Sequence, residues 1–184
     1  MSDVWLISDE HFYHKNITKY TGRLPDSEEM IVENTNRLVK PEDTLIHLGD
    51  VSFNHKKAVD LIKRMDGKHI LVMGNHDLAK RTWYEDNGFM FVCNSFTWSI
   101  SGKYSGPYVL FSHAPIIDLP KDVMYNIHGH HHNSDHRRPE FIAKLNKPSD
   151  IHSYILVNIE ETLSPIRLQD LIFTHKQKVI QENA

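Results

Sequence analysis

Carboxylate, amide and imidazole side chains follow five short apolar runs of this chain, each just past the point where the run ends. The five clusters are Ser8-Asp9-Glu10-His11, Gly49-Asp50, Gly74-Asn75-His76-Asp77, Ser112-His113 and His128-Gly129-His130-His131-His132. Any one of them indicates little, because an Asp after a strand is more often a turn residue or a helix cap. Local hydrogen bonding is a poor explanation for all five together. These side-chain types bind divalent metal ions, so the pattern indicates a shared ligand site.

Unbroken apolar runs precede the clusters and predict the strands that position them. In the first half the runs are Val4–Ile7, Leu45–Leu48 and Ile70–Met73, whose lack of polar alternation predicts strands covered on both faces. In the second half, turn residues separate predicted strands at Phe89–Cys93, Phe96–Ile100, Tyr108–Phe111, Met124–Ile127 and Tyr154–Ile159. Ligand sites of α/β sheets gather beyond the carboxyl ends of strands, so we expect the clusters to converge there.

Helical patterns lie between these strands. One helix is expected to begin at Asp26, with Glu29 forming a capping box, and to end before Pro41. A second follows the apolar spacing of Ala58–Met65, and a third is expected over about 168–175. The alternation predicts an α/β fold. Because no linker or shift in composition interrupts the chain, residues 1–184 are expected to form a single domain.

Composition excludes several classes of function. Lys and Arg number 21 against 24 Asp and Glu, a net charge of −3, so binding to long duplex nucleic acid is not expected. No apolar run is long enough to span a bilayer, and the N-terminus carries no signal-peptide pattern. The single cysteine, Cys93, is expected to be a small buried hydrophobe, and its isolation suits a reducing compartment. A cytoplasmic protein is the prediction. His55 and His69, which flank regular elements, are expected at the surface.

The clusters, in their order along the chain, resemble the motifs of the calcineurin-like metallophosphoesterase superfamily. Those motifs are Asp-x-His, Gly-Asp, Gly-Asn-His-Asp/Glu, a lone His and Gly-His-x-His. Three further segments, 8–17, 112–115 and 157–160, are similar to the small bacterial and phage members that lack a cap domain. The resemblance therefore covers nearly the whole chain. It implies a mixed α/β fold of two packed mixed β-sheets flanked by helices.

The resemblance also assigns ligands for two divalent transition metal ions. One ion would take Asp9, His11, Asp50 and His132, and the other Asp50, Asn75, His113 and His130. Mixed nitrogen and oxygen ligands suit transition metals better than Ca or Mg. Mn is the expected ion, with Fe, Zn, Ni and Co as alternatives.

The implied reaction is hydrolysis of a phosphate ester by a hydroxide that bridges the two ions. His76 matches the family's general acid, which protonates the leaving oxygen. Asp77 is expected to orient or charge-stabilise His76. His14 and Arg23 are expected to contact the substrate phosphate, together with Asn75 and His76.

Substrate class is constrained by one departure from the family pattern. Protein phosphatases of this superfamily continue Gly-Asp into a second Asp and Arg-Gly, whereas Gly49-Asp50 here continues into Val51-Ser52-Phe53-Asn54. A phosphodiesterase acting on a small, nucleotide-like ester is therefore favoured. Two alternatives stay open: a metal-dependent nuclease on short single strands, and a non-catalytic binding module on the same fold. A binding module that no longer catalyses is expected to have lost some of the ligands or His76. Here all seven ligands and His76 are present. No oligomeric state is indicated.

Overall fold

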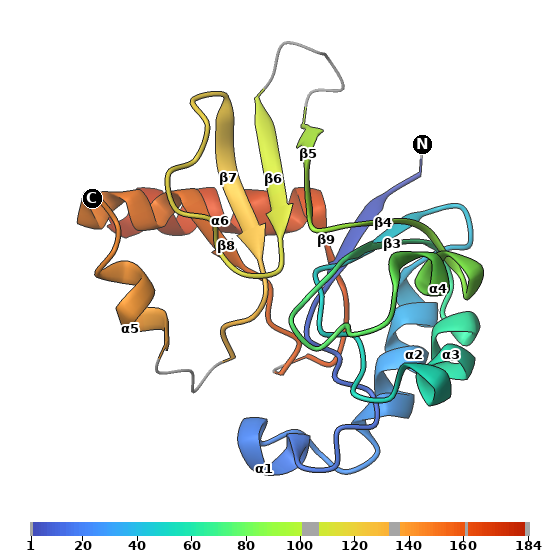
Figure 1. The fold of residues 1–184 in the computed structure, drawn as a ribbon. Helices are drawn as coiled ribbons and strands as arrows, with labels where there is room; N and C mark the ends of the chain where they lie inside the picture. Colours follow the sequence, from blue (N-terminus) through green and yellow to red (C-terminus); the bar gives the residue numbers. More distant parts are fainter. Residues whose placement is uncertain (1, 101–106, 133–136, 161, 183–184) are drawn as a thin grey trace.

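The computed structural model describes residues 2–100, 107–132, 137–160 and 162–182, and in it two mixed β-sheets stand side by side with helices on their outer faces (Figure 1). The first sheet has the order β4-β3-β2-β1-β9 and the second the order β5-β6-β7-β8. The strands are β1 (Val4–Ile7), β2 (Thr44–His47), β3 (Lys68–Val72), β4 (Phe89–Cys93), β5 (Ser95–Ser99), β6 (Tyr108–Ser112), β7 (Val123–His128), β8 (Tyr154–Leu156) and β9 (Ile166–Arg167). The helices are α1 (Ile17–Thr21), α2 (Ser27–Leu38), α3 (His55–Arg64), α4 (Arg81–Asp86), α5 (Arg137–Ile142) and α6 (Leu168–Glu182), with a 3-10 segment η1 (Pro148–Ser153). The α/β fold of two packed mixed sheets expected from the sequence is confirmed.

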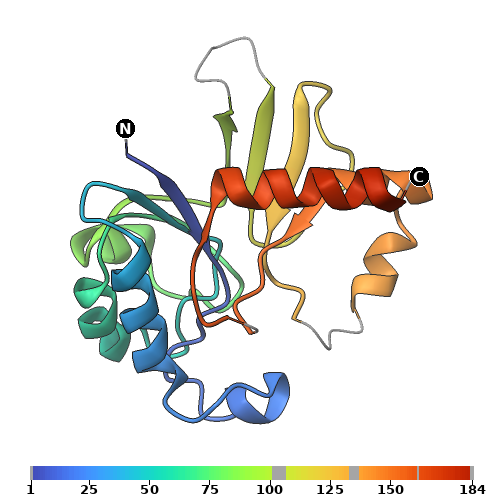
Figure 2. The same ribbon diagram turned by 180° about the vertical axis from the view of Figure 1, so that it is seen from behind.

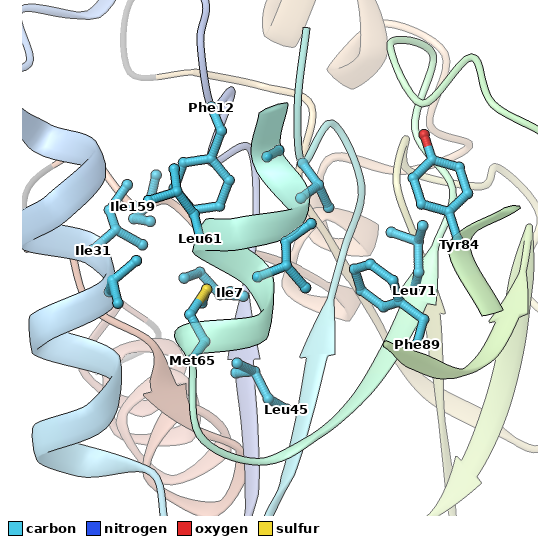
Figure 3. Close-up of a cluster of buried hydrophobic side chains, with 14 of the residues drawn as sticks. Ile7, Phe12, Ile31, Leu45, Leu61, Met65, Leu71, Tyr84, Phe89 and Ile159 are labelled. Carbon is cyan, nitrogen blue, oxygen red and sulfur yellow. The ribbon is translucent and has the colours of Figure 1, made fainter. Parts of the chain in front are cut away.

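The parallel strands at the centre of the first sheet are buried on both faces. Alternate residues along them enter two different cores, because successive side chains of a strand point to opposite faces. Ile7, Leu45 and Leu71 belong to the core beneath α2 and α3, where they lie near Ile31 and Leu61 (Figure 3). Their neighbours face the second sheet. This division explains why the strands read as unbroken apolar runs.

The second core lies between the two sheets and α6. Leu6 and Ile46 from the first sheet meet Phe111 and Ile127 from the second. Helix α6 passes across the second sheet in Figure 2 and adds the buried residue Leu168. The two sheets thus share one apolar interior, which fixes the ends of their strands relative to one another.

Several local expectations were wrong. The capping box at Asp26 does not form; Asp26 makes no side-chain cap, and the Glu29 carboxylate pairs with the Arg64 guanidinium. His69 is not at the surface but buried, 7% exposed, where its ring bonds to His47 and to the carbonyl of Met65. Hydrogen-bond partners inside the core allow the His69 ring to be buried. No sequence pattern predicts these partners.

The ends of some elements also differ. Strand β8 stops at Leu156, and α6 extends to Glu182, well past the expected residue 175. The short elements α1, α4, α5 and β9 were not anticipated. Cys93 is buried and unpaired, as expected. Over the described residues, no helix is both long and apolar enough to cross a membrane.

Candidate metal centre

The polar clusters meet at one end of the two sheets because the strands that carry them are parallel within each sheet. Ile7 of β1 pairs in register with His47 of β2, which pairs with Leu71 of β3. In the second sheet, Ser112 of β6 pairs with His128 of β7. The residues that follow these positions therefore emerge together at the carboxyl ends of the strands.

Asp9, His11 and His132 form the first group of potential metal ligands. The Nε2 atoms of His11 and His132 are 3.2 Å apart. Asp9 Oδ1 lies 3.7 Å from His11 Nε2 and 3.8 Å from His132 Nε2. Three ligand atoms from two sheets thus surround one point.

Asp50, His113 and His130 form the second group. His113 Nε2 lies 3.3 Å from Asp50 Oδ2 and 3.0 Å from His130 Nδ1. The amide oxygen of Asn75 is 3.1 Å from the same His113 nitrogen, which places Asn75 in this group as well. Asp50 Oδ2 is also 4.0 Å from His11 Nε2 of the first group. One oxygen of Asp50 therefore faces both groups, so Asp50 would be the ligand shared by ions held in them.

The donor set fits divalent ions in its spacing and its unmet hydrogen-bonding capacity. Ligand atoms bound at about 2.1 Å to one ion lie about 3.0–3.6 Å apart, depending on the coordination geometry. The separations of 3.0–3.8 Å within the two groups are close to that range. Asp9 Oδ1 is buried and has no hydrogen-bond partner in the part of the chain described. An orphaned carboxylate oxygen of this kind is costly unless a cation satisfies it.

Partners behind the rings set which nitrogen of each histidine faces the site. His113 Nδ1 lies 2.7 Å from the carbonyl oxygen of Leu48, so Nδ1–H donates there and Nε2 faces Asp50. His132 Nδ1 lies 2.8 Å from Glu160 Oε1, which in the same way leaves Nε2 facing Asp9. A carboxylate or carbonyl behind a histidine is the usual means of orienting it towards a metal.

Asp50 and His113 shift each other's pKa in opposite directions. Burial alone would raise the pKa of Asp50, but its hydrogen bond with His113 and the charge of that ring outweigh burial and bring the pKa down to about 2. Burial would lower the pKa of His113, and its hydrogen bond with Asp50 instead raises it to about 9. Burial lowers the pKa of the His11 imidazole to about 2. Without a bound cation, protonated His113 is therefore the counter-ion of Asp50, and metal binding has to displace that proton.

The backbone at the ligands is held in an uncommon conformation. Asp9, His11, Asp50 and His130 have φ angles of 57°, 51°, 56° and 66°. Non-glycine residues rarely adopt the left-handed region, and such residues gather at functional sites.

Asp77 supports this backbone. Its carboxylate accepts hydrogen bonds from the backbone N–H groups of Asp50 and Gly74, both at 2.8 Å, and of Val51 at 3.0 Å. These contacts tie the loop after β3 to the loop after β2. The expected role of Asp77 in orienting or charge-stabilising His76 stays a prediction.

Two glycines allow the loops to approach each other closely. A side chain at Gly74 would lie 2.2 Å from Asp50 Oδ1, and one at Gly129 would lie 2.4 Å from Asp9 Oδ2. Only glycine, which has no Cβ, fits at these two positions.

His76 and His14 stand at the open side of the centre. The His76 side chain is 40% exposed, and its Nε2 lies 3.9 Å from Asp50 Oδ2. The His14 ring is 5.9 Å from that of His11, measured between centroids. Both rings contact Phe53, a residue that the sequence did not single out.

Arg23 lies behind the ligands. It is 4% exposed, and its guanidinium donates to the carbonyls of Asp9 and Glu10 and to Glu160 Oε1. The expected contact with substrate phosphate stays a prediction that this buried position does not favour. Glu160 contacts both Arg23 and His132, a role that the sequence analysis missed. It follows β8 as the predicted ligands follow their strands, so the same rule would have found it.

Known proteins place this arrangement in a class. The model of the calcineurin-like phosphoesterases matches residues 2–177, and the chain belongs to this family. Family membership and the two groups of potential metal ligands together indicate a metal-dependent hydrolase of phosphate esters.

Two proteins resemble the chain over most of its length. An uncharacterized protein of Methanocaldococcus jannaschii is 32% identical over 146 residues, which cover 72% of this chain and 70% of that protein. The crystal structure of a protein of unknown function from Aquifex aeolicus superposes with a TM-score of 0.72 at 27% identity, covering 95% of this chain and all of the other, 100%. The family resemblance inferred from the motifs is confirmed. Neither relative's name indicates a substrate, so the substrate has to be inferred from the geometry of the site.

Proposed function

We propose that this protein is a phosphodiesterase that uses two transition metal ions, foremost Mn, to hydrolyse a small, nucleotide-like phosphodiester. The observation that carries the proposal is the pair of ligand groups joined at Asp50, with the partly exposed His76 imidazole 3.9 Å from the shared carboxylate oxygen. Such ions neutralise phosphate oxygens and supply an activated water at neutral pH.

The side chains of the chain have separate tasks in this proposal. The seven ligands Asp9, His11, Asp50, Asn75, His113, His130 and His132 hold the two ions. His76 donates a proton to the leaving oxygen, and its exposure lets it reach a substrate. His14, on the same open side, contacts the phosphate or its substituent.

A groove beside the second ligand group supports a diester over a monoester. It has a volume of about 240 Å³, adjoins His130, and is walled mainly by Ala114, Pro115, Ile117 and Phe141. Lys144 and Glu140 also line it. A diester has a second substituent that stays on phosphorus, and this groove has room and apolar surface for it. A monoester carries one substituent, its leaving group, so it cannot fill both this groove and the leaving-group position beside His76.

The compartment and partners follow from the same proposal. A small phosphate ester is the expected partner, and long duplex nucleic acid is not. The cytoplasm is the proposed location, since the one cysteine is buried and unpaired.

The test compares bis-p-nitrophenyl phosphate with p-nitrophenyl phosphate as substrates of metal-stripped protein given Mn. We expect turnover to depend on metal and to be faster with the diester. Asp50→Asn should lower turnover by at least about 10²-fold, because it removes the shared carboxylate charge. Asp60→Asn, an exposed carboxylate on α3, is the matched control and should keep full activity. No turnover of either ester with two ions bound would exclude the proposed function, and faster monoester cleavage would redirect it to a phosphatase.

A further inference from the structure

Phe53 is an exposed aromatic residue placed among the imidazoles of the site. Its ring stacks on that of His76, with centroids 4.3 Å apart and planes at 30°. The His14 ring contacts it at an angle of 61° with centroids 4.0 Å apart, and the His11 centroid lies at 5.5 Å. Phe53 nevertheless keeps 44% of its surface exposed. A large apolar side chain left half in water beside a polar site indicates a use other than filling the core.

The His76 ring has few contacts that fix its orientation, and its Nε2 lies 3.9 Å from Asp50 Oδ2, beyond hydrogen-bond distance. Its backbone N–H donates to Asp50 Oδ1 at 2.8 Å, which fixes the main chain. Among the residues described, no hydrogen bond to the ring itself is found. The stack with Phe53 and an edge contact with His11 at 5.7 Å are the ring's aromatic contacts.

Phe53 is itself held firmly. Its backbone N–H donates to the carbonyl of Phe12 at 3.1 Å, and the Ser52 hydroxyl donates to the same carbonyl at 3.0 Å. The next residue, Asn54, caps α3 through a hydrogen bond from the Lys57 N–H at 3.2 Å. A β-bridge between Phe12 and Ser52 on one side and a helix cap on the other therefore fix the backbone from which the Phe53 ring extends.

We propose that Phe53 is a positioning residue that holds the His76 imidazole in the orientation needed to protonate the leaving oxygen. The inference rests on the proposed function, in which His76 is the general acid. Stacking suits this task because a hydrogen-bonding partner would occupy one of the two ring nitrogens, whereas an apolar face leaves both free. Orientation matters because proton transfer requires the donor nitrogen within hydrogen-bond reach of the leaving oxygen.

The kinetic test uses leaving groups that differ in their need for a proton. Phenol is a poor leaving group, with a pKa of about 10 as in Tyr, and p-nitrophenol is a better one. We expect Phe53→Leu to lower kcat for diphenyl phosphate about tenfold or more, a part of the 10²–10⁴ that a general acid contributes, and to change bis-p-nitrophenyl phosphate less than about threefold. Phe53→Tyr should restore the phenyl ester rate. His76→Ala should show the same selectivity, and adding Phe53→Leu to it should cost nothing further.

Two controls separate positioning from general damage. Phe173→Leu, at an exposed phenylalanine on α6, should leave both rates unchanged. In metal-free protein, the ring current of Phe53 should shift the His76 ring-proton resonances, and this shift should vanish in Phe53→Leu and persist in Phe53→Tyr.

The outcomes distinguish this inference from the proposed function. Wild-type protein that cleaves neither diester overturns the proposed function. If the wild type is active but Phe53→Leu lowers kcat equally for both esters, the positioning role alone is overturned. The same holds if the losses of kcat are additive in the double variant. An unchanged His76 resonance in Phe53→Leu overturns it as well.

Discussion

At the scale of single residues, the candidate ligands sit on strained backbone. Four of the seven have φ between 51° and 66°, a region that costs a non-glycine residue about 1–2 kcal/mol. The side-chain types of these ligands could be found from the sequence, because each follows an apolar run. Their backbone conformation could not, since His and Asp are common in relaxed turns too. Phe53 was missed for a similar reason: its contacts are with residues distant in sequence.

Strain at His11 makes a prediction about two variants that remove the same ring. His11→Gly should be more stable than His11→Ala by about 1 kcal/mol, because glycine adopts the left-handed region freely. The free energy of unfolding, measured in urea with EDTA present, checks this. His113, whose φ is not positive, is the control: there the Ala variant should be the more stable by about 0.5–1 kcal/mol. The same order at both positions would contradict the strain.

At the scale of elements, what the sequence predicted best is the strand followed by its ligands. Apolar runs identified the strands of both sheets to within a few residues at most ends, since burial on two faces removes polar alternation. Elements held by tertiary contacts escaped, as α1, α4 and α5 are short and β9 has two residues. The polar network inside the first sheet also escaped. Glu10, His47 and His69 come from three adjacent segments, and no local pattern relates them.

That network leads to a prediction about stability and pH. Burial, followed by the charge of His47, lowers the pKa of His69 to about 4 from an ordinary value of 6.5. The unfolded chain therefore takes up a proton below about pH 6.5 that the folded chain accepts only near pH 4. The contribution of neutral His69 to the free energy of unfolding is therefore complete above pH 6.5. As the pH falls to 4, about 3 kcal/mol of it is lost.

His69→Gln tests the assignment, because glutamine keeps a donor and an acceptor but has no proton to gain. Urea unfolding of metal-free protein at several pH values should show a shallower fall between pH 6.5 and 4 in this variant. Parallel curves for the two proteins would assign the pH dependence to other groups.

At the scale of the whole molecule, the candidate metal centre draws its ligands from both sheets. In each of the two ligand groups, side chains from the first sheet's loops face histidines from the second. Bound ions should therefore stabilise the fold as well as the reaction, because metal that binds only the folded state shifts unfolding.

Removal of metal should lower the melting temperature. At a free metal concentration about a thousand times Kd the stabilisation is about 4 kcal/mol, which corresponds to roughly 8–16 °C for a chain of this length. Scanning calorimetry of Mn-loaded and EDTA-treated protein measures it. In Asp50→Asn, where the shared ligand is weakened, the difference should shrink. Equal melting temperatures with and without metal in the wild type would show that the ions do not hold the sheets together.

The crossing from one sheet to the other bears on how the molecule moves. Strand β4 ends at Cys93 and β5 begins at Ser95, so Asn94 alone separates them. Hinged closure needs several residues that can absorb large changes in φ and ψ, and a one-residue connection beside a shared core offers little such freedom. The two halves should therefore behave as one rigid body in solution. Substrate capture and product release then fall to the loops around the rim, and turnover should be governed by their motions rather than by opening of the sheets.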